Sequence, residues 1–216
     1  MLAVFDSPTS SRRWPAAVKG DGWRTSVRVA VALTAIGLIG ARPGARAAEE
    51  PADPAELDKP VKDFELPDVA ADKKVKLSDY KGKIVVLVWH SPGCSASPAY
   101  NDRIKEFVEA YKDKKVGLLL INSSEADDVK SLREYAEDEK FTFPVLRDGK
   151  AAVAGYFRIE QTGTFLIVDA KRVLRYRGGF DDSVDAKRVK RHYVKDAVET
   201  LLKGDSLLFK ETFAFG

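Results

Sequence analysis

The chain has 216 residues, of which 44% are hydrophobic, enough for one ordinary domain with a buried core and short appendages. The formal net charge is +3, but residues 1–47 hold seven of the 36 basic residues and only two of the 33 acidic ones. The rest of the chain is slightly acidic, which argues against a nucleic-acid-binding function. Because Cys94 is the only cysteine, an intramolecular disulfide is excluded.

The N-terminal segment is typical of a secretory signal peptide. Residues 27–41 form an apolar run preceded by basic residues, and an Ala-Arg-Ala sequence ending at Ala47 fits a small-x-small cleavage site. We therefore expect residues 1–47 to be a signal peptide and the mature protein to be exported to the periplasm. The run is short for a span of ~20 residues. The alternative is an uncleaved N-terminal anchor, which would be the only membrane contact.

Residues 48–60 are rich in Pro, Asp, Glu and Ala and predict a disordered linker. The folded domain is expected at residues 61–205, with a C-terminal tail at 206–216. Apolar and polar residues alternate in two short segments and predict strands there, with one helical turn after them; four later segments predict further strands. These expected strands cover residues 61–66, 73–77, 84–89, 116–121, 165–168 and 173–176.

Apolar residues at helical spacing predict helices that begin near Ser97, Val129 and Val194. Strands and helices alternate in the first part of the domain, which implies parallel strands, whereas the last two strands are joined by a short turn and should form a hairpin. This order predicts an α/β fold, a three-layer α/β sandwich with a mixed central sheet. Beyond the hairpin, Asp181 and Asp182 could be a pair of ligands on a loop, but a solvated start of a helix is favoured.

Cys94 is the sharpest chemical feature of the sequence. It follows the continuous apolar run at residues 84–89 and a turn, and it precedes a helix for which Ser97 is the expected N-cap and Pro98 the first turn. Backbone N–H groups and the helix dipole at such a position stabilise a thiolate, and ligands of open α/β sheets bind beyond the carboxyl ends of strands. The alternative is a small buried apolar residue, which the preceding Pro92 and Gly93 disfavour.

Two polar residues near Cys94 have alternative interpretations. His90 could raise the thiolate fraction or bind a metal ion together with Cys94. An ordinary strand-end histidine is favoured, because two ligands do not make a zinc site and His192 lies in the last helix. Ser91 could offer its hydroxyl to a peroxide oxygen or be an ordinary turn residue. Neither a metal ion nor a cofactor is expected.

The sequence KLSDYKGKIVVLVW followed by Cys94, together with the order of elements, resembles the redoxin group of the thioredoxin fold, which includes peroxiredoxins and periplasmic thiol reductases. It is most similar to exported single-domain redoxins of the AhpC/TSA type, whose signature is a cysteine, a tyrosine six residues on and an arginine nine on. Cys94, Tyr100 and Arg103 match that signature. The later segments VAGYFRI, TFLIVDA, RYRGGFDD and RHYVKDAVETLLKGD are similar too. The resemblance covers residues 61–216 and implies a thioredoxin-like fold.

The resemblance also implies an activity: thiol-dependent oxidoreductase or antioxidant chemistry through Cys94, with Ser91 at the position where peroxiredoxins have threonine or serine. The expected partners are a peroxide or a protein or low-molecular-weight thiol, and an external reductant. The groove for substrate or partner would be lined by Trp89, His90, Gly93, Ser97, Tyr100, Arg103 and Thr162.

Three positions depart from the family pattern. Ser97 stands where thioredoxin-type sites have their second cysteine, so a mixed disulfide at Cys94 could not be resolved internally. Thr162 stands where thioredoxins have a cis-proline and peroxiredoxins an arginine, and Leu87 stands where peroxiredoxins have a proline. These departures keep a second function open: a catalytically degenerate thioredoxin-fold binding module of the cell envelope.

Overall fold

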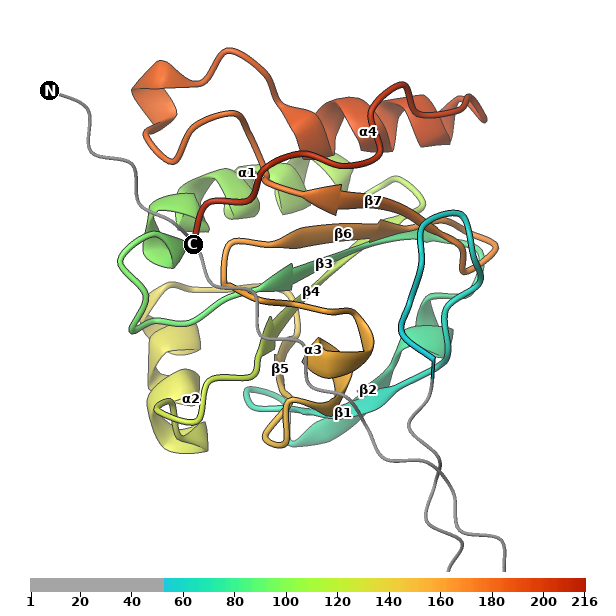
Figure 1. The fold of residues 1–216 in the computed structure, drawn as a ribbon. Coiled ribbons are helices and arrows are strands. Elements are labelled where there is room, and N and C mark those ends of the chain that lie inside the picture. Colours follow the sequence, from blue (N-terminus) through green and yellow to red (C-terminus); the bar gives the residue numbers. More distant parts are fainter. Residues whose placement is uncertain (1–52) are drawn as a thin grey trace, which may run out of the picture. The chain divides into compact units, whose positions relative to one another are not determined.

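The computed structural model describes residues 53–216 (Figure 1). The predicted signal peptide and the first part of the predicted linker lie outside these residues. In the part of the chain that is described, no helix is both long and apolar enough to cross a membrane.

The middle layer is a seven-stranded sheet with the order β2-β1-β5-β4-β3-β6-β7. Its strands are β1 (Glu65–Asp68), β2 (Lys73–Lys76), β3 (Ile84–Trp89), β4 (Val116–Asn122), β5 (Val145–Arg147), β6 (Phe165–Val168) and β7 (Leu174–Gly178). Strands β3, β4 and β5 are parallel, whereas β6 runs antiparallel to β3, β7 to β6, and β1 to both β2 and β5. The mixed sheet and the final hairpin are confirmed.

Helices cover both faces of this sheet. They are α1 (Asn101–Tyr111), α2 (Val129–Asp138), α3 (Ala152–Tyr156) and α4 (Tyr193–Leu202), with 3-10 turns at Leu77–Tyr80, Ser97–Tyr100 and Ala186–Arg188. One core packs the sheet against α1, α2 and α4, and a second core lies under α3 and the N-terminal segment. The predicted three-layer α/β sandwich is therefore confirmed.

Strand β3 is the centre of the molecule and positions the cysteine. All six of its residues are buried. Because successive side chains of a strand point to opposite faces, Val86 and Val88 enter one core while Leu87 and Trp89 enter the other. Pairing to β4 on one side and β6 on the other holds the end of β3 on both edges. The turn that carries Cys94 thus starts from a firmly held strand.

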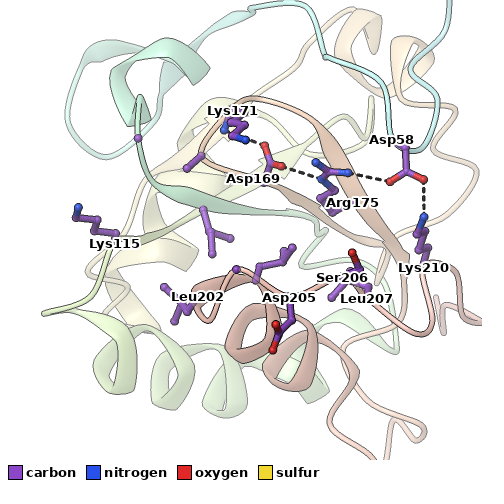
Figure 2. Close-up of a pocket in the computed structure, with 15 residues that line it drawn as sticks. Asp58, Lys115, Asp169, Lys171, Arg175, Leu202, Asp205, Ser206, Leu207 and Lys210 are labelled. Carbon is purple, nitrogen blue, oxygen red and sulfur yellow. Dashed lines mark hydrogen bonds and ion pairs between the residues drawn. The ribbon is translucent and has the colours of Figure 1, made fainter.

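The prediction of a disordered linker is wrong for residues 53–60. Ala55 is 4% exposed, and its N–H donates to a carbonyl at the end of α3 at 2.8 Å. The Asp58 carboxylate accepts from Lys210 at 2.6 Å and from Arg175 at 3.1 Å, as Figure 2 shows. A polar, proline-rich composition predicts disorder because it offers little apolar surface to bury. Here the segment is held by the Ala55 anchor and by backbone hydrogen bonds of Asp58 and Lys59 with Leu174, with the ion pairs of Asp58 beside them.

The predicted C-terminal tail also packs on the domain. The N–H of Arg177 in β7 donates to the Lys210 carbonyl at 2.9 Å, and the N–H of Thr212 donates back to the Arg177 carbonyl at 3.1 Å. We call residues 210–216 the C-terminal strap. In Figure 1 this red segment passes β7 and ends on the side of the sheet where β3 leads into α1.

Candidate functional site

Cys94 lies in the connection between β3 and α1, and its side chain is half-buried. The 3-10 turn Ser97–Tyr100, with Pro98 in its first turn, leads directly into α1. The predicted N-cap role of Ser97 is wrong, because Ser97 is the first residue of the turn and makes no capping bond. Its hydroxyl instead accepts the N–H of Ser91 at 3.5 Å, which ties the two ends of the cysteine turn together.

The surroundings of the thiol favour its ionised form. Cys94 Sγ accepts the backbone N–H of Ala96 at 3.4 Å. Partial burial opposes ionisation, but hydrogen bonds from the Thr162 side chain and from the backbone and hydroxyl of Ser97 outweigh it, together with the Ala96 N–H. The net result is that the pKa of Cys94 lies below its ordinary value. The sequence predicts this direction from the strand-to-helix position alone, but not that Thr162 contributes to it.

Thr162 comes to Cys94 from the loop between α3 and β6. The loop is fastened to the end of β3, because the Gly163 N–H donates to the Trp89 carbonyl at 2.8 Å and the Trp89 N–H donates to the Thr164 carbonyl at 3.0 Å. The structure therefore places Thr162 at the end of the strand that leads to Cys94, although the two predicted site residues are 68 positions apart in the printed sequence.

The Ser91 hydroxyl is committed to the turn. It donates to Asp127 Oδ2 at 2.6 Å and accepts the N–H of Gly93 at 3.2 Å. The side chain of Asn122 donates to the same Asp127 oxygen at 2.6 Å and to the His90 carbonyl at 3.0 Å. In this arrangement the Ser91 proton points to a carboxylate, so the predicted donation to a peroxide oxygen is not available. Sequence reasoning missed both Asn122, at the end of a buried strand, and Asp127, two residues before a predicted helix.

The His90 ring is hydrogen-bonded to Asn101. It is 2% exposed, and its Nε2 lies 2.9 Å from Asn101 Oδ1. The Asn101 amide donates to the Tyr135 hydroxyl at 2.6 Å, so its oxygen is left to accept from His90 Nε2–H. Burial lowers the pKa of His90, which favours the neutral imidazole. The favoured strand-end role fits this geometry, in which the ring hydrogen-bonds Asn101 and not Cys94.

Much of the predicted groove is buried, so the prediction that these residues line a surface for a partner is wrong for four of them. Each of the four is at most 2% exposed: Trp89, His90, Ser97 and Tyr100. The Trp89 indole packs on Phe157 with ring centroids 5.7 Å apart and donates to a hydroxyl at 3.2 Å. Large aromatic side chains beside a reactive residue resemble a binding surface in the sequence, but here they complete the two cores. The surface around the thiol is formed by small exposed residues such as Gly93 and Ser95.

Arg103 and Asp181 form a buried ion pair behind Cys94, where the sequence predicted a solvated aspartate. Arg103 Nη1 lies 2.6 Å from Asp181 Oδ2, with the two side chains 12% and 0% exposed, and His192 Nδ1 lies 2.8 Å from the other oxygen. The guanidinium also stands 4.5 Å above the Tyr100 ring. Burial raises the pKa of Tyr100 to about 12, although Arg103 opposes the shift. The Tyr100 hydroxyl has no hydrogen-bond partner among residues 53–216.

Two other features bear on ligand binding. Within residues 53–216, no three His, Cys, Asp or Glu side chains are grouped so that they could hold a metal ion. A cleft of about 460 Å³ lies next to Ile84, the first residue of β3, and thus at the opposite end of that strand from Cys94 (Figure 2). Its charged lining is largely self-paired, with Arg175 between Asp58 and Asp169.

The chain thus has a thioredoxin-like fold with a half-exposed thiol directly beyond its central strand. The chain belongs to the AhpC/TSA family, whose profile matches residues 57–177. At the level of this family, the match supports a thiol oxidoreductase role of the redoxin type.

Individual relatives agree with this assignment. A Mycobacterium tuberculosis protein named as a peroxiredoxin is 32% identical over 108 residues, which cover 47% of this chain and 64% of the relative. The chain spans less than two thirds of the length of the curated relatives it matches. Among solved structures, a conserved protein of Geobacillus kaustophilus has a TM-score of 0.68 at 26% identity, over 73% of this chain and 87% of that one. Peroxidoxin BcpB of M. tuberculosis, with a TM-score of 0.56 at 20% identity over 69% and 97% of the two chains, shares the fold.

Proposed function

We propose that the protein is a thiol-dependent oxidoreductase of the redoxin type that reacts through Cys94 and relies on an external thiol to complete its cycle. The observation that carries the proposal is the half-exposed thiol whose hydrogen bonds lower the pKa of Cys94. A thiolate is the nucleophile in both peroxide and disulfide chemistry. Family membership supports the general reaction class.

With a peroxide as oxidant, the Cys94 thiolate attacks one peroxide oxygen. An S–O bond forms, the O–O bond breaks, and the leaving oxygen takes a proton, which gives a sulfenic acid and water or an alcohol. An external thiol then condenses with the sulfenic acid, releasing water and forming a mixed disulfide. A second external thiol attacks this disulfide and restores Cys94 while the two reductant sulfurs become oxidised. Because the chain has one cysteine, both resolving thiols come from other molecules.

We further propose that this chemistry takes place after export to the periplasm. The proposal rests on the apolar run and the Ala-Arg-Ala sequence of residues 1–47. The intact mass of the protein from the periplasmic fraction tests it, since cleavage predicts a chain that begins at Ala48. Full-length protein in the membrane fraction would instead support the uncleaved anchor.

The reaction is tested by intact mass after a brief exposure to peroxide, with and without a trap for sulfenic acids. We expect a trapped adduct on the wild-type protein, none on Cys94→Ser, and a rate above that of free cysteine. A thiol that titrates near the unperturbed ~8.5 and alkylates no faster than a cysteine-containing peptide would refute the proposal.

A specific observation favours a second candidate, the catalytically degenerate binding module: the Ser91 hydroxyl is bound to Asp127 and is not free for substrate. In this case Cys94→Ser would retain full biological function, measured by complementation of a strain that lacks the gene. A phenotype for Cys94→Ser equal to that of the deletion would exclude the binding module.

A further inference from the structure

The C-terminal strap, residues 210–216, is built into the edge of the sheet. The N–H and the carbonyl of Arg177 in β7 both hydrogen-bond the strap backbone, and Glu211 forms a parallel bridge with Arg177. The Thr212 hydroxyl lies 2.5 Å from the Tyr176 hydroxyl and accepts the N–H of Gly179 at 3.1 Å. The strap thus runs beside the edge strand β7 and is attached to it through both backbone and side chains.

Three glycines leave the space that the strap occupies. A Cβ built on Gly178 would lie 2.2 Å from the Thr212 hydroxyl oxygen, and one on Gly179 would lie 2.6 Å from a strap carbonyl. A Cβ on Gly163, which has a φ of +71°, would lie 2.0 Å from the Phe215 carbonyl oxygen. Each of these distances is shorter than real Cβ contacts allow. The strap therefore packs against three glycines in turn: one in β7, one just after β7 and one in the loop before β6.

The end of the strap contacts the loop that carries Thr162. The Gln161 side chain donates to the Ala214 carbonyl at 2.5 Å. A Cβ built on Gly216 would lie 2.1 Å from the Thr162 carbonyl oxygen, so the strap and this loop are in direct backbone contact. On its other side the loop is bonded to the end of β3 through Gly163 and Trp89. Residues 161–163 are thus held between the central strand and the strap.

We propose that the strap is a positioning element of the Cys94 site: it holds the loop at residues 161–163 on the end of β3, from which the cysteine turn starts, and so keeps Thr162 in place beside that turn. A surface loop that contains a left-handed glycine loses much conformational freedom when it is ordered, and a second set of contacts offsets that cost. Without the strap, the loop would keep its bonds to β3 and the bond from the Thr164 hydroxyl to the Gln161 carbonyl, and Thr162 would be held less firmly beside the cysteine turn. This inference rests on the proposed function, because it concerns the reactivity of the same thiol.

The test is the pH dependence of the alkylation rate of Cys94, measured on the wild-type protein, on a chain that ends at Glu211, on Thr162→Val and on the combination of both changes. The first expectation is that truncation and Thr162→Val each raise the thiol pKa by about one unit, the size expected for loss of one hydrogen bond to a charged group. The second is that the combination raises it no further, because both changes remove the same contact. Gly155→Ala is the matched control, since its Cβ meets nothing within 4 Å.

The outcomes separate the two proposals. A wild-type pKa near its ordinary value refutes the proposed function. A lowered wild-type pKa that survives truncation overturns the role of the strap alone. A thiol pKa that is higher in the combined variant than in Thr162→Val also overturns the role of the strap, because the strap would then affect Cys94 through a contact other than Thr162. If the truncated chain does not fold, Gly216→Val decides, since its side chain collides with the loop and leaves the attachment to β7 intact; an unshifted pKa in Gly216→Val overturns the inference.

Discussion

Replacing Asp181 by asparagine should destabilise the protein more than most single changes on its surface loops. The carboxylate is fully buried and faces two cationic or potentially cationic groups, with Arg103 at 2.6 Å and His192 at 2.8 Å. Breaking a buried ion pair from one side costs about 3–5 kcal/mol, because the remaining charge is left without its partner. Arg103 retains the carbonyls of three other residues as acceptors. We therefore expect the lower end of that range, about 3 kcal/mol.

Urea unfolding at neutral pH, with the slope of the transition compared between variants, measures this loss. The control is Glu134→Gln, which removes an exposed ion pair to Lys130 at 3.6 Å with side chains 59% and 86% exposed. That change should alter the free energy of unfolding by less than about 0.5 kcal/mol. The contrast between the two variants isolates burial as the cause, since both convert a carboxylate to an amide.

A double variant sharpens the argument. Arg103→Leu combined with Asp181→Leu removes both charges, so neither is left buried alone. The double variant should therefore lose at least about 2 kcal/mol less free energy of unfolding than the sum of the losses of the two single variants. The reasoning is refuted if Asp181→Asn loses less than about 1 kcal/mol, or if the two single changes simply add. Either result would mean that water reaches the pair and screens it.

Three further predictions follow from burial and hydrogen bonding. Hydrogen bonding holds the pKa of Cys94 below its unfolded value of ~8.5, so thiol ionisation adds stability above that pH, and this is lost as pH falls through the folded pKa. The free energy of unfolding of the wild type relative to Cys94→Ser should rise with pH across this window, and a flat difference in urea unfolding would contradict it. Leu87→Ala should cost about 3–4 kcal/mol in the same assay, whereas Leu208→Ala, at a residue 88% exposed, should stay within about 0.5 kcal/mol. Asp127→Ala removes the acceptor of the Ser91 hydroxyl and should cost about 2 kcal/mol; unchanged hydrogen exchange in the cysteine turn would count against this role.

The sheet could be predicted because its signal is local. Six consecutive apolar residues at Ile84–Trp89 need two buried faces, and only a central strand covered by helices on both sides provides them. The sequence predicts the hairpin of β6 and β7 equally well, since the connection between these strands is too short for a crossover. The position of Cys94 beyond the central strand followed from the same pattern. In each case the residues that carry the signal are neighbours in the sequence.

The parts of the site that could not be predicted depend on contacts between distant segments. Nothing near Asp181 indicates that Arg103 will meet it, and a polar pair after two glycines resembles a solvated loop. The burial of Tyr100 likewise depends on Phe180, which packs beside it with ring centroids 6.3 Å apart. The C-terminal strap was missed because its signal, Gly178 and Gly179, is also the ordinary signal for the end of a strand.

The geometry around Cys94 also explains why an external thiol suits the proposed reaction. Ser97, at the position where a second cysteine would stand, is 1% exposed and holds the cysteine turn through Ser91. The Ser97 hydroxyl already hydrogen-bonds Cys94, but an oxygen at this position cannot form the disulfide that a second cysteine would form. Solvent instead reaches the thiol past Gly93 and Ser95, both exposed and both small. An incoming thiol therefore approaches Cys94 without displacing a large side chain, while Thr162 can stabilise Cys94 as the thiolate that leaves when the mixed disulfide is reduced.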